Sequence, residues 1–189
     1  MDITKRKINR SIVFAIGLFL GGLIISFYVG PAYVALADSG VDGIEIVTDR
    51  EYFDRVFELI DSADTSIHLV MFEIKYYEKY PNSEVNQLVE KLIAKNSAGV
   101  DVKIIVDQFL TDKLAVELLQ KTGVNIKWDS TKVSTHNKLM IVDGRVVLIG
   151  STNWSYYSFS KNHESNVIFD DKESAKKFEQ YFERVWQES

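Results

Sequence analysis

Short apolar runs alternate with amphipathic stretches through most of the chain, from Ile44 to Trp186. Seven runs are rich in Val and Ile and short enough to be strands. Four stretches carry apolar residues at the i, i+3, i+4, i+7 spacing of a helix with one buried face. The predicted strands are Ile44–Val47, Ser66–Ile74, Val102–Val106, Val124–Trp128, Leu139–Val142, Val146–Ile149 and Asn166–Phe169. The predicted helices are Tyr52–Asp61, Glu84–Asn96, Asp112–Lys121 and Lys172–Trp186.

Alternation of strands with helices predicts an α/β fold, specifically an α/β/α sandwich with a mixed, mostly parallel sheet. The strands on either side of Asp143-Gly144 are an exception, because this dipeptide is a strong signal for a tight hairpin. A two-residue turn there makes the two strands antiparallel. It also gives facing residues whose numbers add up to 287, so that His136 faces Ser151.

The N-terminal segment reads as a transmembrane helix preceding this domain. Residues 11–37 contain no charged side chain, and Ser11–Gly30 is 20 residues long, about 30 Å as a helix. Four basic residues precede it and acidic residues follow it, which predicts a cytoplasmic N-terminus and a domain outside the membrane. The expected organisation is therefore a membrane segment over residues 1–37 and a single domain over residues 38–189.

A cleaved signal peptide is the alternative interpretation of the same segment. Ala35-Leu36-Ala37 resembles a small-residue cleavage site, and cleavage near Ala37 would release a secreted domain. The apolar stretch is longer than the usual 7–15 residues of a signal peptide, which favours an uncleaved anchor.

Composition narrows the chemistry of the domain. The chain has no cysteine, which excludes disulfides, cysteine-ligated zinc and a thiol nucleophile. Its net charge is −5, and the first 37 residues are basic, so residues 38–189 carry a net charge of −8. Non-specific nucleic-acid binding depends on Lys and Arg neutralising phosphates, and the excess of acidic residues in this domain does not favour such binding.

The segment Lys75–Ser83 mixes lysines with tyrosines. It is either an ordinary surface loop or a site where aromatic rings contact bases or lipid.

The polar residues that point to chemistry gather around the expected hairpin. His136 and Lys138 lie on the same side of an extended chain, because side chains alternate with a period of two. Across the hairpin, Ser151 and Asn153 follow Gly150, where a backbone without a side chain can approach a ligand closely. An imidazole surrounded by an ammonium, a hydroxyl and an amide suits a tetrahedral anion such as a phosphodiester.

The spacing of these residues resembles the signature of the phospholipase D superfamily. The sequence reads His136-x-Lys138-x4-Asp143-x6-Gly150-Ser151-x-Asn153, and this matches H-x-K-x4-D-x6-G-S-x-N at six positions within 18 residues. The chain is similar to the small members with a single motif, which are bacterial endonucleases and the membrane-anchored mitochondrial cardiolipin hydrolase group.

The resemblance implies a role for each residue. His136 would be the nucleophile that forms a phosphohistidine, as in other covalent catalysis. Lys138, Ser151 and Asn153 would hold the phosphate oxygens. Glu164 would accept a hydrogen bond from the imidazole and orient it. Strand alternation points Asp143 away from His136, so Asp143 is expected to be structural. Gly150 is also assigned to the structural part of the motif.

The mechanism needs a second imidazole, because the leaving oxygen must be protonated. The chain has one motif, since neither His68 nor His163 is followed by Lys two residues later. We therefore expect a homodimer with one composite site on its two-fold axis. No metal or cofactor is needed by this mechanism.

The expected substrate is a phospholipid, because of the negative charge of the domain and the expected membrane anchor. DNA or RNA is the alternative substrate. A non-catalytic membrane-tethered binding module is the alternative if the protein is not an enzyme.

Overall fold

A seven-stranded sheet organises the part of the chain that the computed structural model describes, which comprises residues 43–109 and 112–189. The strands lie in the order β1-β7-β6-β5-β2-β3-β4. Their bounds are β1 Ile44–Thr48, β2 Ser66–Met71, β3 Asp101–Val106, β4 Asn125–Trp128, β5 Lys138–Val142, β6 Val146–Gly150 and β7 Ser165–Asp170. All seven strands agree with the sequence prediction to within a few residues.

The prediction of a mostly parallel sheet is wrong. Only the β2–β3 and β3–β4 pairs are parallel, and the four other neighbouring pairs are antiparallel. Parallel neighbours need a crossover helix, and helices of full length connect only β2, β3 and β4 in this way. In the C-terminal half a tight turn joins β5 to β6, and β6 reaches β7 through the five-residue helix α4 (Tyr156–Ser160). The chain therefore reverses at each step.

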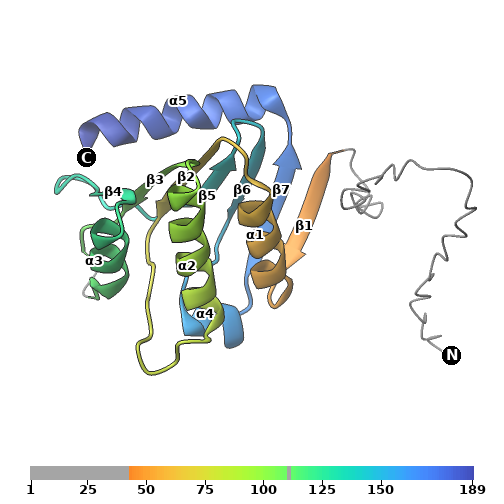
Figure 1. The fold of residues 1–189 in the computed structure, drawn as a ribbon. Coiled ribbons are helices and arrows are strands. Elements are labelled where there is room, and N and C mark those ends of the chain that lie inside the picture. Colours follow the sequence, from red (N-terminus) through yellow and green to blue (C-terminus); the bar gives the residue numbers. More distant parts are fainter. Residues whose placement is uncertain (1–42, 110–111) are drawn as a thin grey trace, which may run out of the picture. The chain divides into compact units, whose positions relative to one another are not determined.

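Helices cover both faces of the sheet, as expected of an α/β/α sandwich (Figure 1). The helices α1 (Glu51–Ser62), α2 (Glu84–Ser97) and α3 (Leu114–Lys121) pack on one face. The helix α5 (Lys172–Glu188) packs on the other face, where Phe182 is fully buried against strand residues such as Val70. Side-chain alternation divides each central strand between the two cores.

The predicted transmembrane segment, the alternative cleavage site near Ala37 and the boundary between residues 37 and 38 lie outside the described residues. Within residues 43–109 and 112–189, no helix has the length and apolar character needed to span a bilayer.

The hairpin between β5 and β6 forms at Asp143-Gly144, but its register differs from the prediction by one residue. Both residues have positive φ, 53° and 57°, and the Arg145 N–H donates to the Val142 carbonyl at 3.0 Å. Val142 pairs with Val146, so three residues, Asp143, Gly144 and Arg145, lie between the two strands where two were predicted. Facing numbers therefore add up to 288, and the expected pairing of His136 with Ser151 is not formed.

The Asp143 side chain accepts hydrogen bonds from the backbone that leads into β2. It lies at the end of β5 opposite to Lys138, and its Oδ1 accepts from Thr65 N at 2.7 Å and Ser66 N at 2.9 Å. Its Oδ2 accepts from Asp64 N at 3.0 Å. Burial by itself would raise the pKa of the Asp143 carboxyl, but these backbone donors outweigh burial and lower that pKa. The carboxylate thereby ties the hairpin to the start of β2.

Replacing the carboxylate in Asp143→Asn should lower the free energy of unfolding by about 1.5–3 kcal/mol at pH 7, the range for hydrogen bonds to a charged group. The lowered pKa means that this contribution is complete above the unfolded-state pKa of about 3.9 and is lost as pH falls through the folded-state pKa. Thermal denaturation should therefore separate wild type and variant at neutral pH. The difference should begin to shrink below about pH 4 and disappear only below the lowered folded-state pKa. The control Asp170→Asn removes a more exposed ion pair with Arg145 and should have a smaller effect. An equal loss for both variants at every pH would contradict this role.

Candidate active site

The motif residues meet at one edge of the sheet because β5, β6 and β7 are antiparallel. Lys138 begins β5, Gly150 ends β6 and Ser165 begins β7, so these three positions share an edge. The end of β2 contributes too, because Phe72 N donates to the Asn137 carbonyl at 2.8 Å. The same edge appears at the lower end of the sheet in Figure 1, where α4 lies.

His136 and Lys138 are in direct contact at this edge. The Lys138 ammonium donates to His136 Nδ1 at 3.2 Å and to the His136 carbonyl oxygen at 3.0 Å. His136 is exposed, whereas Lys138 is 3% exposed. The Phe72 ring supports both, with its centroid 4.7 Å from the imidazole and 5.0 Å from the ammonium. A reactive ring thus faces solvent with a fixed cation beside it.

The environment of Lys138 makes its protonated form less stable than that of a lysine in water. Burial lowers the pKa of the Lys138 ammonium, and the negative charges of Glu164 and Glu73 only partly oppose this effect. Because the ammonium has already lost part of its hydration, binding a phosphate oxygen costs it less desolvation free energy. The negative charge of that oxygen would in turn stabilise the protonated ammonium.

Gly150 serves the packing of the site rather than close approach of a ligand. A Cβ at this position would lie 2.1 Å from Asn166 Oδ1 and 2.6 Å from the Ser165 carbonyl oxygen. The buried Asn166 side chain occupies that space and donates from Nδ2 to Thr152 Oγ1 at 2.9 Å. The absent side chain therefore lets Asn166 hold the bend that carries Ser151 and Asn153.

Ser151 and Glu164 form the second contact pair of the site. The Ser151 hydroxyl donates to Glu164 Oε2 and accepts from Ser165 N at 3.2 Å. The other carboxylate oxygen of Glu164 accepts from Asn162 Nδ2 at 3.0 Å. The expected hydrogen bond from the His136 imidazole to Glu164 is not formed within the described chain. Instead, Glu164 accepts from Ser151, and both residues lie just beyond the end of the β6–β7 ladder.

Asn153 presents an unpaired polar atom. Its Oδ1 is shielded from solvent and has no hydrogen-bond partner in the described chain, although a buried amide normally finds one. The backbone around it is well fixed, since Trp154 N donates to the Glu73 carbonyl at 3.0 Å and Lys75 N donates to the Trp154 carbonyl at 2.9 Å. An unpaired amide on a fixed backbone is suited to contact a ligand or a second subunit.

Sequence reasoning missed a buried carboxylate that positions the histidine loop. Asp107 follows β3 directly and is fully buried. Its Oδ2 accepts from Thr135 N at 2.7 Å and Ser134 Oγ at 2.8 Å, and its Oδ1 accepts from Phe109 N at 2.8 Å. The sequence signal that could have indicated this residue is its position, because Asp107 directly follows the apolar strand that ends at Val106. The role of Phe72 was hidden because the sequence placed it inside a strand predicted to run to Ile74.

The other two histidines do not join His136. His68 is buried, stacks on Phe182 at 4.6 Å and contacts Glu179 Oε2 at 2.7 Å, which places it in the core beneath α5. His163 is fully exposed and lies 3.1 Å from Asp49 Oδ2. Among residues 43–109 and 112–189, no group of three or more His, Asp or Glu side chains is arranged to hold a metal ion.

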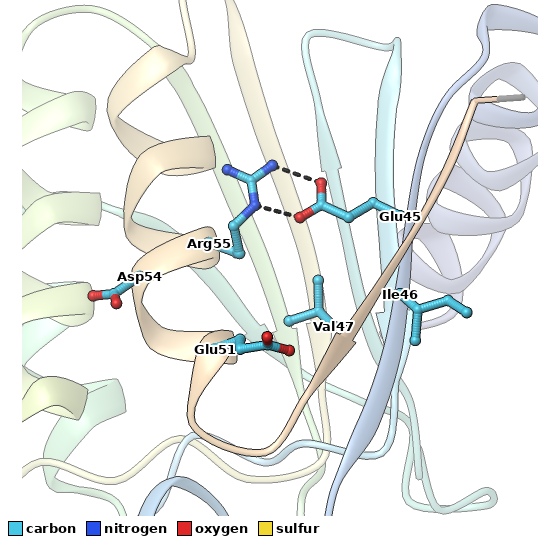
Figure 2. A pocket seen from close by; sticks show the side chains of 6 residues that line it. All are labelled: Glu45, Ile46, Val47, Glu51, Asp54 and Arg55. Atoms are coloured by element: carbon cyan, nitrogen blue, oxygen red, sulfur yellow. Dashed lines mark hydrogen bonds and ion pairs between the residues drawn. The ribbon is translucent and has the colours of Figure 1, made fainter. Parts of the chain in front are cut away.

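A small pocket of about 270 Å³ lies between β1 and α1, away from these residues (Figure 2). The Arg55 guanidinium bridges it with two bonds to the Glu45 carboxylate, at 2.6 and 2.7 Å. The bidentate pair ties the edge strand to the first helix and has no contact with the motif.

The fold and the motif define a phospholipase D-like domain. Residues 56–186 match the family described as "Cardiolipin synthase, PLD-like domain", so the chain belongs to this family and has a single copy of the His-x-Lys motif.

Named relatives agree with this assignment. Mitochondrial cardiolipin hydrolase of Xenopus tropicalis is 31% identical over 138 residues, which are 72% of this chain and 61% of that protein. Probable cardiolipin synthase YwiE of Bacillus subtilis (strain 168) is 33% identical over 168 residues, which are 85% of this chain and 31% of that protein. The crystal structure of Nuc, a phospholipase D family member from Salmonella typhimurium, superimposes with a TM-score of 0.66 at 25% identity, covering 77% of this chain and 95% of Nuc. The chain spans about half to three fifths of the length of the cardiolipin hydrolases it matches.

The pKa of Lys138 predicts the alkaline side of a pH–rate profile. Only the protonated ammonium can donate to a phosphate oxygen, so kcat/KM for a phosphodiester should fall as pH rises through the lowered pKa, below the ordinary lysine value of about 10.4. Lys138→Arg should move this fall out of the measurable range, because a guanidinium stays protonated, while the altered geometry lowers the neutral rate about 10²-fold. An alkaline limb at the same pH in both proteins would show that another group causes it.

Proposed function

We propose that this domain hydrolyses phosphodiesters in two displacement steps, with His136 as the nucleophile. The observation that carries the proposal is the contact of an exposed imidazole with a buried ammonium at an edge where Ser151 and Asn153 also lie. The arrangement combines a nucleophile with donors for the charge that develops on phosphate oxygens.

The contact between Lys138 and His136 suggests how substrate starts the reaction. In the free protein the ammonium occupies Nδ1, so the neutral ring carries its proton on Nε2. When a phosphate oxygen accepts the hydrogen bond of the ammonium, Nδ1 no longer has that donor. The ring proton can then lie on Nδ1, which leaves the lone pair of Nε2 free. Nε2 then attacks phosphorus, the bond to the leaving oxygen breaks, and a phosphohistidine forms.

A second imidazole, which must be in its protonated form when the substrate is bound, has to protonate the leaving oxygen and later take a proton from the attacking water. His68 is buried and His163 binds Asp49, so neither is placed beside His136 in the described chain. We therefore propose a homodimer in which His136 of each copy faces one shared phosphate. Water then displaces His136 from phosphorus, and both imidazoles return to their starting protonation states.

The favoured substrate is a phospholipid. The net charge of −8 over residues 38–189 does not favour a long polyanion, and the apolar segment Ser11–Gly30 supports an anchor that keeps the domain on the extracytoplasmic side of a membrane. Extraction of membranes with alkaline carbonate would release the protein if this segment does not anchor it. The second candidate is a metal-independent endonuclease that acts on DNA or RNA, which the resemblance of the single His-x-Lys motif to small bacterial endonucleases supports.

Trapping the covalent intermediate tests the proposal. Wild-type protein quenched in alkaline denaturant during turnover should show a mass increase on a His136 peptide, since the step links the substrate phosphoryl group to that ring. The added mass identifies the substrate, being a phosphatidyl group from phosphatidylglycerol or a nucleotidyl group from single-stranded DNA. Turnover should survive EDTA and fall at least about 10³-fold in His136→Ala.

The matched control is His163→Ala, which removes a fully exposed imidazole from the same edge and should keep turnover within about twofold. Unchanged turnover in His136→Ala would favour another site. Loss of turnover in EDTA that zinc or magnesium restores would contradict the proposed mechanism.

A further inference from the structure

A groove of about 960 Å³ lies next to the candidate active site. Its walls come from the segment that joins β2 to α2 and from α4, and both lie at the lower end of the sheet in Figure 1. Small-molecule sites occupy roughly 300–1,000 Å³ and are lined mainly by apolar and aromatic side chains. The lining here is mainly of that kind: it includes Tyr77, Tyr80, Pro81, Val85, Tyr157 and Phe159.

The floor of the groove is fixed, while two rings at its rim face solvent. The Tyr156 N–H donates to the Tyr77 hydroxyl at 2.9 Å, which joins α4 to the opposite wall. Buried Asn86 holds Tyr77 in place by accepting from its N–H at 2.8 Å and donating to its carbonyl at 3.0 Å. In contrast, Tyr80 is 68% exposed and Tyr157 is 69% exposed. Burial of these two rings needs a ligand or a surface.

The groove is close enough to the site for one molecule to contact both. Tyr156 follows Asn153 by three residues, so the Cα atoms can be at most about 11 Å apart. The two segments that form the walls are also joined near the site, because the Trp154 backbone makes hydrogen bonds with the backbone of Glu73 and Lys75. A ligand with its phosphate at Asn153 can therefore extend an attached chain into the groove.

The charges of the groove favour an apolar chain over a nucleic acid. Its lining contains one cation, Lys79, and one acidic residue, Glu84, whose charges cancel. Burial raises the pKa of the Glu84 carboxyl, and the negative charge of Asp54 adds to this effect. Proteins that stack successive bases on aromatic rings also follow the phosphates with a positively charged groove, and this lining does not provide one.

We propose that this groove binds a hydrocarbon chain of a phospholipid whose phosphate lies against His136, Lys138 and Asn153. The proposal rests on the phosphodiesterase function proposed above. Its evidence for a lipid substrate comes from the groove and not from the catalytic residues. Contacts with Tyr80 and Tyr157 then make hydrolysis depend on chain length, because each buried CH₂ adds favourable transfer free energy.

The test compares two substrates with the full chain in nonionic detergent: dioleoyl and dihexanoyl phosphatidylglycerol. The double variant Tyr80→Ser/Tyr157→Ser should lower the ratio of kcat/KM for the long over the short substrate at least tenfold relative to wild type. Tyr80→Phe/Tyr157→Phe keeps the apolar rings and should restore the ratio. Ile46→Thr, which alters a 66% exposed apolar residue on the edge strand, should leave the ratio unchanged.

An unchanged ratio in the serine variant would overturn the proposal, as would a loss confined to cleavage of a single-stranded oligonucleotide, which would indicate stacked bases. Hydrolysis of bis(p-nitrophenyl) phosphate separates the two levels of inference. If wild type cleaves it in a His136-dependent manner but shows no preference for the long-chain lipid, the groove assignment fails alone. If no His136-dependent cleavage of any diester occurs, the proposed function fails as well.

Discussion

The tight turn at Asp143-Gly144 is the constraint on which the candidate site depends. It reverses the chain so that the start of β5 and the end of β6 share an edge, which brings Lys138 beside the bend at Ser151. The same aspartate binds three successive backbone positions at the start of β2. Because β2 ends at the site with Phe72 beside His136, this carboxylate links the hairpin of β5 and β6 to a third strand that reaches the site. A residue at the far edge, about 16 Å away along a five-residue strand, thus positions the chemistry.

Local patterns predicted the elements, and the alternation of side chains along an extended chain placed His136 and Lys138 together. The runs of Val and Ile gave all seven strands, and helical spacing gave α1, α2, α3 and α5, because burial of one face imposes those periods. The five-residue helix α4 has too few turns to show a period, so it was missed. Strand direction was mispredicted because alternation along the sequence does not reveal which connections cross the sheet. The register was missed by one residue because nothing local distinguishes Arg145 as an insertion.

Side-chain partners at the site depended on contacts between distant segments, which the sequence could not give. Gly150 was expected to be structural and also to let a ligand approach the backbone, but the space beside it is filled by the Asn166 side chain. Glu164 was expected to orient the imidazole, yet in this chain it binds the hydroxyl of Ser151. The site therefore consists of two contact pairs, His136 with Lys138 and Ser151 with Glu164. Within this chain neither pair supplies the proton donor that the leaving oxygen needs, which is why the second copy is central to the proposed chemistry.

Mixed dimers test that point most directly. Wild-type and His136→Ala chains, each with its own affinity tag, can be co-expressed and purified through both tags in turn, so that every dimer contains one intact imidazole. If both imidazoles act on one phosphate, the mixed dimer should lose at least about 100-fold in turnover, as expected when a general acid is removed. A mixed dimer with half the wild-type turnover, or an active monomer in light scattering, would contradict the shared site.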